Sequence, residues 1–558
     1  MKIEQGQRLC VITLALLNSL SAHAQPVAPN AGQLMLELQK QPELNAPKTI
    51  TPLRAEGEVA PKGAANNEVR IAVKAIHVTG NSIYPASELQ AMVANLVGGE
   101  FTLAELDAGA ARITAYYRER GYVVARAYLP EQEIKNGVVT IKVLEGIVGQ
   151  QRVNNQALLT DDRANNYLRG KSGDVLQAKP VDRTLLLLAD TPGVGGARAI
   201  LQPGASVGTS DLLIELIPSA PYTANVELDN YGNRSTGEHR LGAALAVNSP
   251  LKIGDQLSFR ALTSDENMVY LRLSYQLPVG GDGWRMGAAY SDMRYRLGKE
   301  FAALQASGSA VNSSLFAVYP FIRSLTTNLS GTLTWEDKQL NDRTNAPATA
   351  SNKQVQLVNF GLAGSHQDQL GGAGVTAFDF AFVTGNLSMD AGSLAADNLS
   401  AKSNGSFTRL AYSGSRLQRL SESNILSVAI SGQLAGKNLN SSEKFILGGA
   451  NGVRAYPQGE GNGDEGWLAN LELRHNITPS VQGVLFYDAG SVDINRNLFA
   501  AGSNTRTLSG TGIGANAKIN GVQIKTYLAW RTSGGQPTSE PTTIDRNPRL
   551  WVQAGMQF

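Results

Sequence analysis

The sequence predicts a mainly β fold, in which a sixteen-stranded antiparallel transmembrane β-barrel follows two small α+β domains and an N-terminal helix. From residue 222 to the C-terminus, apolar and polar residues alternate with a period of two, as in strands whose two faces meet different surroundings. Short and long connections between these segments alternate as well, which is typical of barrels with tight turns on one rim and long loops on the other. Beyond residue 25, no apolar run is long enough for a membrane helix.

The chain begins with a segment typical of a secretory signal peptide. Lys2 and Arg8 precede an apolar run, and the small-residue step around His23 indicates that residues 1–24 are removed. The only cysteine, Cys10, lies inside that run, so we expect a mature chain without disulfides or cysteine metal sites. A lipid anchor on Cys10 is the alternative, which is disfavoured because no apolar segment precedes this residue.

Residues 25–68 are rich in proline and contain one expected helix, over residues 31–41. Its Leu34, Met35 and Leu38 form a short apolar stripe at helical spacing. The segment is either a plug helix with its linker or a tail that docks weakly or not at all.

Residues 69–146 are predicted to form a small domain of strand, helix, helix, strand and strand. Thr102 and Glu105 have the spacing of a capping box at the start of the second helix, and Gly121 ends that helix. The expected elements are residues 73–80, 87–97, 102–120, 122–129 and 138–144.

Residues 147–219 repeat this order of elements without obvious sequence identity, which indicates a duplicated architecture. The expected elements are residues 148–153, 161–168, 181–189, 197–201 and 212–217.

Residues 220–558 contain sixteen alternating segments, and an even number returns the chain to its starting side. Open sheet edges are not tolerated in lipid, so we expect the strands to close around a lumen wide enough for water. A soluble β-sandwich is the weaker alternative. The segments start near residues 222, 240, 256, 268, 283, 314, 328, 353, 374, 405, 424, 466, 481, 508, 521 and 549. Long polar links are expected at residues 294–313, 337–352, 386–404, 435–465, 491–506 and 532–547.

The longest link holds an arginine, Arg454, between apolar Val453 and Tyr456. An arginine in an exposed loop is usually solvated, but these neighbours favour a loop that enters the lumen, over residues 436–465. A desolvated guanidinium needs a carboxylate partner. The candidate is Asp488, because strand alternation places it with Phe486 on the face that would line the lumen. From spacing alone, both a solvated arginine and a bidentate latch pair remain open.

The acidic run that follows Arg454 contains Glu460, Asp464 and Glu465. It lacks the alternating ligand pattern of a calcium loop, and we expect it to be solvated. The histidines are scattered singly, so no metal site is predicted. The string of residues 204–208 matches G-x-S-x-G but lacks the strand before it and the helix after it, so no enzyme is predicted. No cofactor is expected, and a formal net charge of +2 gives no bulk attraction for nucleic acid.

The chain resembles the transporter component of two-partner secretion systems, the hemolysin activation and secretion protein family. The segments 121–130, 137–139 and 143–146 look like the family's first POTRA (polypeptide-transport-associated) domain. The loop residues Val453, Arg454, Ala455 and Tyr456, and the strand residues Phe486, Asp488 and Gly490, look like its paired loop and strand motifs. The resemblance covers nearly the whole mature chain.

The resemblance implies a signal peptide, a plug helix, two POTRA domains in the periplasm and a sixteen-stranded barrel in the bacterial outer membrane. It also implies that Arg454 pairs with Asp488. Ala455 stands where the superfamily commonly has glycine, and alanine resists positive φ, which leaves the geometry of the loop tip open. The terminal Phe558 resembles the signal by which the barrel assembly machinery recognises outer-membrane barrels.

The implied function is outer-membrane translocation, with or without activation, of a large secreted partner such as a hemolysin or an adhesin. A monomer is expected, with the exoprotein client and outer-membrane lipid as its other partners. One alternative is a POTRA-containing barrel that inserts other outer-membrane proteins. A second is a passive porin, which leaves the two small domains unexplained, and a third is a secreted adhesin or enzyme.

Overall fold

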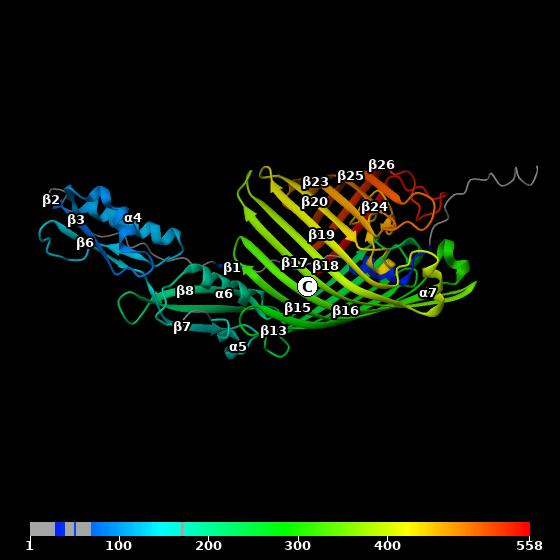
Figure 1. The fold of residues 1–558 in the computed structure, drawn as a ribbon, viewed down its shortest axis with the longest axis horizontal. Coiled ribbons are helices and arrows are strands. Elements are labelled where there is room, and N and C mark those ends of the chain that lie inside the picture. Colours follow the sequence, from blue (N-terminus) through cyan, green and yellow to red (C-terminus); the bar gives the residue numbers. More distant parts are fainter. Residues whose placement is uncertain (1–27, 40–48, 52–68, 169–171) are drawn as a thin grey trace, which may run out of the picture.

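The computed structural model describes residues 28–39, 49–51, 69–168 and 172–558. The predicted signal peptide lies outside the described residues, as does most of the predicted linker. Two small α+β domains lie in a row beside the barrel, and the N-terminal helix lies inside the barrel (Figure 1). In the described part of the chain, no helix is long and apolar enough to cross a membrane.

The first α+β domain packs α4 against a three-stranded sheet of order β3-β6-β5. The capping box of α4 is present, because the Thr102 side chain accepts from the Glu105 amide while Glu105 binds back to Thr102. The predicted first strand is divided at Lys74, and its first part pairs with β4. The elements are β2 (Arg70–Val73), β3 (Ala75–Thr79), α3 (Ala86–Ala91), η1 (Ala94–Leu96), β4 (Gly99–Thr102), α4 (Leu103–Glu119), β5 (Arg126–Tyr128) and β6 (Val138–Leu144).

A buried carboxylate, Glu145, ties the loop after β3 to the rest of this domain. It accepts hydrogen bonds from the amides of Ser82 (2.7 Å) and Ile83 (2.9 Å) and from the Tyr117 hydroxyl (2.7 Å). Burial alone would raise the pKa of Glu145, but these hydrogen bonds outweigh it and hold the pKa below its ordinary value.

The second α+β domain has a four-stranded sheet of order β1-β8-β9-β7. Its outer strand comes from far away in the sequence, because β1 (Thr49–Thr51) pairs in parallel with β8, with Ile50 opposite Ala197. The other elements are β7 (Ile147–Asn155), α5 (Asp161–Asn165), α6 (Ala178–Asp190), β8 (Val194–Pro203) and β9 (Thr209–Pro218).

Sixteen antiparallel strands form a closed barrel, as predicted. The first and last strands close it with five residue pairs, from Asn225 opposite Gln557 to Asp229 opposite Gln553. The strands are β10 (Tyr222–Asp229), β11 (Arg240–Asn248), β12 (Gln256–Ser264), β13 (Val269–Val279), β14 (Trp284–Arg296), β15 (Ser307–Arg323), β16 (Thr327–Asn345), β17 (Ala348–Asp368), β18 (Gly374–Met389), β19 (Gly405–Arg419), β20 (Asn424–Ala435), β23 (Glu465–Thr478), β24 (Val481–Asp493), β25 (Thr505–Ile519), β26 (Val522–Ser533) and β27 (Arg549–Gln557).

The predicted long link over residues 337–352 is wrong, because β16 and β17 continue through it to a turn of two residues. The link predicted over 294–313 is also too long, since β15 begins at Ser307 after the short helix η3 (Lys299–Leu304). In both places the strands extend as a polar ribbon. The inward-facing residues of the β16 extension include Lys338 and Asp342 beside the buried Leu340, so apolar and polar residues no longer alternate there. Backbone pairing persists, so the sequence pattern ends before the strand does.

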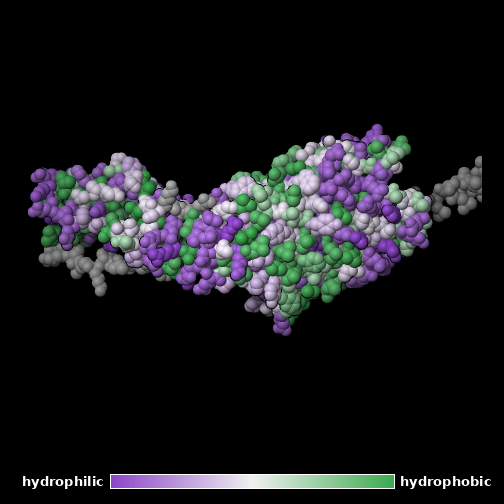
Figure 2. Space-filling model, turned by 90° about the horizontal axis from the view of Figure 1, so that it is seen from below, coloured by the Kyte–Doolittle hydropathy of each residue, from purple (hydrophilic) through white to green (hydrophobic). Residues whose placement is uncertain are grey.

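The outer face of the barrel is apolar. Outward-facing Phe259, Leu273 and Leu485 are exposed, whereas their neighbours in sequence point inward. Figure 2 shows hydrophobic residues gathered over the barrel and hydrophilic residues more common over the two small domains. An exposed apolar surface of this extent fits contact with lipid.

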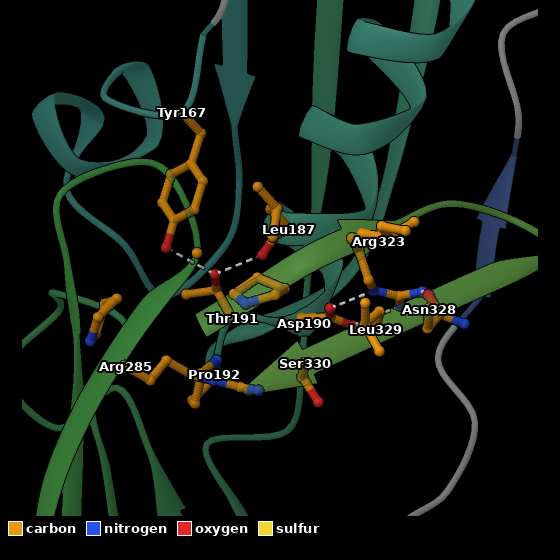
Figure 3. A pocket seen from close by; sticks show the side chains of 14 residues that line it. Tyr167, Leu187, Asp190, Thr191, Pro192, Arg285, Arg323, Asn328, Leu329 and Ser330 are labelled. Atoms are coloured by element: carbon orange, nitrogen blue, oxygen red, sulfur yellow. Dashed lines mark hydrogen bonds and ion pairs between the residues drawn. The ribbon is translucent and has the colours of Figure 1, made fainter. Parts of the chain in front are cut away.

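The second α+β domain is fixed to the barrel rim that carries the short turns. Arg323 of β15 forms a bidentate ion pair with Asp190 at the end of α6, with N–O distances of 2.7 and 2.8 Å (Figure 3). A cavity of about 310 Å³ lies beside this pair. Gly281, in the turn before β14, lies so close that a Cβ there would be 1.8 Å from the Asn166 carbonyl oxygen.

Candidate functional site

The link between β20 and β23 folds into the barrel as a compact loop. Within it, β21 (Phe445–Ile446) pairs with β22 (Asn462–Gly463), and the short helix η4 (Ser441–Glu443) precedes this pair. Leu447, Val453 and Tyr456 are buried against strands of the wall. The loop therefore has a core of its own that is continuous with the barrel.

Arg454 lies against Asp488 of β24. Its Nε donates to Asp488 Oδ2 at 2.8 Å and its Nη2 to Oδ1 at 2.7 Å, so the ion pair is bidentate. The side chains are 5% and 0% exposed. The amide of Arg454 also donates to Asp488 Oδ2 at 3.1 Å, and Asn470 Nδ2 donates to Oδ1 at 2.8 Å. The carboxylate thus receives four hydrogen bonds, which compensate its burial.

Three further side chains complete the surroundings of Arg454. Its Nη1 donates to Glu472 of β23 at 2.7 Å, and the guanidinium carbon lies 3.6 Å from the ring centroid of Phe486. Trp551 of β27 donates its indole N–H to the Arg454 carbonyl oxygen at 2.7 Å. The arginine therefore connects the loop to β23, β24 and β27, and its planar group is held by charge and by stacking at once.

The remaining motif residues fit the loop to the wall. Ala455 does not adopt positive φ, so this alanine is not strained. Its methyl group lies over Gly510 of β25, where a Cβ would be 2.5 Å away. Gly490 similarly makes room for Leu447, whose Cδ1 would be 2.5 Å from a Cβ at position 490. The Tyr456 hydroxyl is 2.6 Å from the carbonyl oxygen of Ser533 and accordingly ties the loop to the end of β26.

The acidic run after Arg454 was expected to be solvated, and for two of its residues this is wrong. Glu460 and Asp464 are buried with 0% exposure. Glu460 accepts from the amides of Thr538 and Ser539, both at 2.9 Å, and pairs with Arg506 at 2.7 Å. Their partners come from distant loops, so no local pattern could reveal this burial.

The N-terminal helix, α2, is present over Ala31–Gln39, and the last two residues of the predicted helix lie outside the described residues. It lies inside the barrel, where Leu34, Met35 and Leu38 are buried in a cluster with inward-facing residues of the wall such as Met293 and Val355. The apolar stripe thus faces the barrel wall.

Phe558 is exposed at the end of the closing strand, and its backbone exchanges two hydrogen bonds with Ala224 of β10. Among the described residues, no group of three or more His, Cys, Asp or Glu side chains has an arrangement that could hold a metal ion.

Comparison with known proteins finds families and relatives that share this architecture. Residues 208–517 match the model of the haemolysin secretion/activation protein family ShlB/FhaC/HecB, and residues 71–146 match the ShlB-type POTRA domain. The chain is 31% identical over 476 residues, 83% of each chain, to the heme/hemopexin transporter protein HuxB of Haemophilus influenzae (strain 86-028NP). It is 24% identical over 433 residues, 75% of each chain, to the outer membrane transporter CdiB of Dickeya dadantii (strain 3937).

The solved structure of CdiB from Escherichia coli has the same fold, with a TM-score of 0.71 and 20% identity over 99% of both chains. The barrel accordingly lies in the outer membrane, and the α+β domains are POTRA domains on its periplasmic side. The family model matches more than half of the chain, the HuxB relative is 31% identical, and the fold is shared with CdiB. The chain therefore belongs to the haemolysin secretion/activation protein family ShlB/FhaC/HecB.

Proposed function

We propose that this protein translocates one large secreted partner protein, or a few, from the periplasm to the cell surface by two-partner secretion. The observation that carries the proposal is a wide barrel whose lumen holds a separate N-terminal helix and an anchored loop, with POTRA domains on the entrance side. A passive porin has no use for a helix packed inside its lumen. Named relatives are transporters, which fits this function.

Residues 436–465 act as a latch loop in this proposal, with Arg454 and Asp488 as the latch pair, and α2 acts as the plug. The bidentate contact with its buried carboxylate supports the first role. The burial of Leu34, Met35 and Leu38 against the inner wall supports the second. Passage of a client then requires the helix to leave the lumen.

The POTRA domains, residues 69–146 and 147–219, would bind the unfolded client before it enters. Strand addition suits this step because backbone pairing tolerates varied side chains. The β8 edge supports the idea, since it already pairs with a short extended segment of the same chain, Thr49–Thr51. The other partners are outer-membrane lipid around a monomeric barrel and, through the Phe558 signal, the barrel assembly machinery.

The test compares the proteins of the culture supernatant and of the outer membrane between the native strain and a strain that lacks this gene. We expect one large exoprotein to disappear from the supernatant while the outer-membrane proteins stay unchanged. Broad depletion of barrel proteins from the membrane would contradict secretion and favour the alternative, an assembly factor. The alternative is kept because the fold is shared with BamA from Haemophilus ducreyi, at a TM-score of 0.54 and 14% identity.

A further inference from the structure

The N-terminus of the plug helix is capped by a residue of the barrel wall. The Ala31 amide donates to Asp342 Oδ1 of β16 at 2.8 Å. The first amides of a helix lack partners within the helix, and a negative charge at this end is favourable. Tyr295 of β14 donates its hydroxyl to the same carboxylate at 2.5 Å. Asp342 is thus held by the wall and directed at the helix.

The first turn of α2 also touches the latch loop. Gly32 packs on η4 so closely that a Cβ would lie 2.6 Å from Ser441 Oγ and 2.8 Å from the Ser442 amide nitrogen. Ser441 Oγ donates to Asn30 Oδ1 at 2.7 Å. The helix therefore rests on the loop as well as on β16.

The loop at this point is fixed by a cluster of buried charges. The Glu443 carboxylate at the end of η4, with 0% exposure, binds Lys338 Nζ of β16 at 2.8 Å and Arg409 Nη2 of β19 at 3.0 Å. Gln433 of β20 donates to the Glu443 carbonyl oxygen at 2.8 Å. Removing one partner from such a buried cluster leaves an uncompensated charge, so η4 resists displacement.

From these contacts we infer that Asp342 and η4 form a preformed seat for the plug, and that the seat stays in place when the plug leaves. Asp342 is the positioning residue that sets how long α2 remains in the lumen. Lys338, Arg409 and Glu443 keep η4 in position with or without the helix. The inference rests on the proposed function, in which α2 closes the barrel. The inference adds an order of events to that function: α2 leaves the lumen first, while η4 stays in place. This order follows because hydrogen bonds hold the helix to the seat, whereas buried ion pairs hold the loop.

The first test measures ion conductance of the full-length protein in planar bilayers. Asp342→Ala removes the acceptor of the Ala31 amide, while Asn30 still accepts from the Gln33 amide at 3.1 Å. We expect the open fraction to rise about five-fold, the effect typical of losing one capping hydrogen bond. Asp342→Asn keeps an acceptor without the charge and should give a smaller rise. Asp368→Ala is the matched control: this carboxylate binds Arg416 elsewhere on the barrel, and its loss should leave conductance unchanged. Deletion of residues 28–39 gives the fully open reference.

The deletion of residues 28–39 distinguishes a failure of the seat from a failure of the plug. If the deletion opens the channel and Asp342→Ala does not, the seat is wrong while the plug stands. If the deletion itself leaves conductance unchanged, α2 is no plug, and the seat falls with it. A heat-modifiability gel of each variant checks that the barrel is folded.

The second test asks whether the seat stays. Hydrogen exchange of the amides of residues 440–447 is compared between the full chain and the chain without residues 28–39, both folded in detergent. We expect protection of the segment to change by less than about three-fold. A loss of more than ten-fold would mean that loop and plug are released together, which would overturn the inference. Glu443→Gln is the positive control, because it weakens the ion cluster and should lower protection in both chains.

Discussion

Replacing either Arg454 or Asp488 by alanine should lower the free energy of unfolding of the barrel nearly as much as replacing both. Each residue is almost fully buried, and removing one partner of a buried ion pair typically costs about 3–5 kcal/mol, since the other charge remains. Two independent losses would sum to about 6–10 kcal/mol. In the double mutant no charge is left without its partner, so we expect a loss close to that of a single mutant and a coupling energy of about 3 kcal/mol.

The geometry also orders the two single variants. Asp488→Ala removes the acceptor for the Arg454 amide and for Asn470 in addition to the guanidinium. Arg454→Ala leaves Asp488 with two donors, Asn470 and the backbone amide of residue 454, while Glu472 keeps Arg474 at 2.7 Å. We therefore expect Asp488→Ala to be at least as costly as Arg454→Ala.

The first measurement is urea unfolding of the detergent-solubilised barrel, monitored by the loss of the heat-modifiable folded band on a gel. The second is the amount of client exported by each variant, for the client found in the supernatant comparison. Arg416 and Asp368 provide the control, because this pair has similar chemistry but side chains about one quarter exposed. Its loss should cost at most about 1 kcal/mol. Fully additive losses in the Arg454 and Asp488 double mutant would refute the reasoning.

Further variants test three other contacts. Glu145→Gln should weaken the first POTRA domain by about 1.5–3 kcal/mol near neutral pH, because hydrogen bonds to a charged acceptor are lost. The folded pKa of Glu145 lies below its unfolded value, so its contribution to the stability of the domain is present above the unfolded pKa and is lost as pH falls through the folded pKa. Hydrogen exchange at several pH values should show this loss in the wild type and a flatter pH profile in the variant. Gly510→Ala should destabilise the latch loop, and Ala455→Gly in the same chain should restore it, as read from urea midpoints. Gly281→Ala should push Asn166, and with it the second POTRA domain, away from the barrel turn, which broadens spin-label distances between that domain and the barrel.

Two of these predictions have an outcome that would contradict them, and the third has a control variant. A Glu145→Gln domain whose pH profile matches the wild type would remove the carboxylate from the explanation. If Ala455→Gly fails to restore Gly510→Ala, the methyl contact is not the source of the loss. Gly280→Asn serves for Gly281, because position 280 has open space around a Cβ and asparagine tolerates its φ of +67°.

Periodicity predicted the barrel well because one face of each strand meets lipid. All sixteen strands were expected, and strand alternation placed Asp488 on the inner face, where the structure brings Arg454 to it. Outside the membrane the signal disappears, so the extensions of β16 and β17 were missed.

Contacts between distant segments could not be predicted either. Glu460 meets Thr538 across 78 positions, and Ala31 meets Asp342 across 311. Neither pairing leaves a local pattern, and burial of each charge depends on the closed barrel.

The joint between the second POTRA domain and the barrel rim has a consequence for client entry. With Asp190 bound to Arg323 and Asn166 against Gly281, this domain is expected to keep one orientation over the mouth of the pore. A client segment bound there is held near the entrance as if tethered by a short linker. Its next step then occurs at an effective concentration in the millimolar range, irrespective of how dilute the client is in the periplasm. The rate of entry should therefore saturate once the domain is occupied.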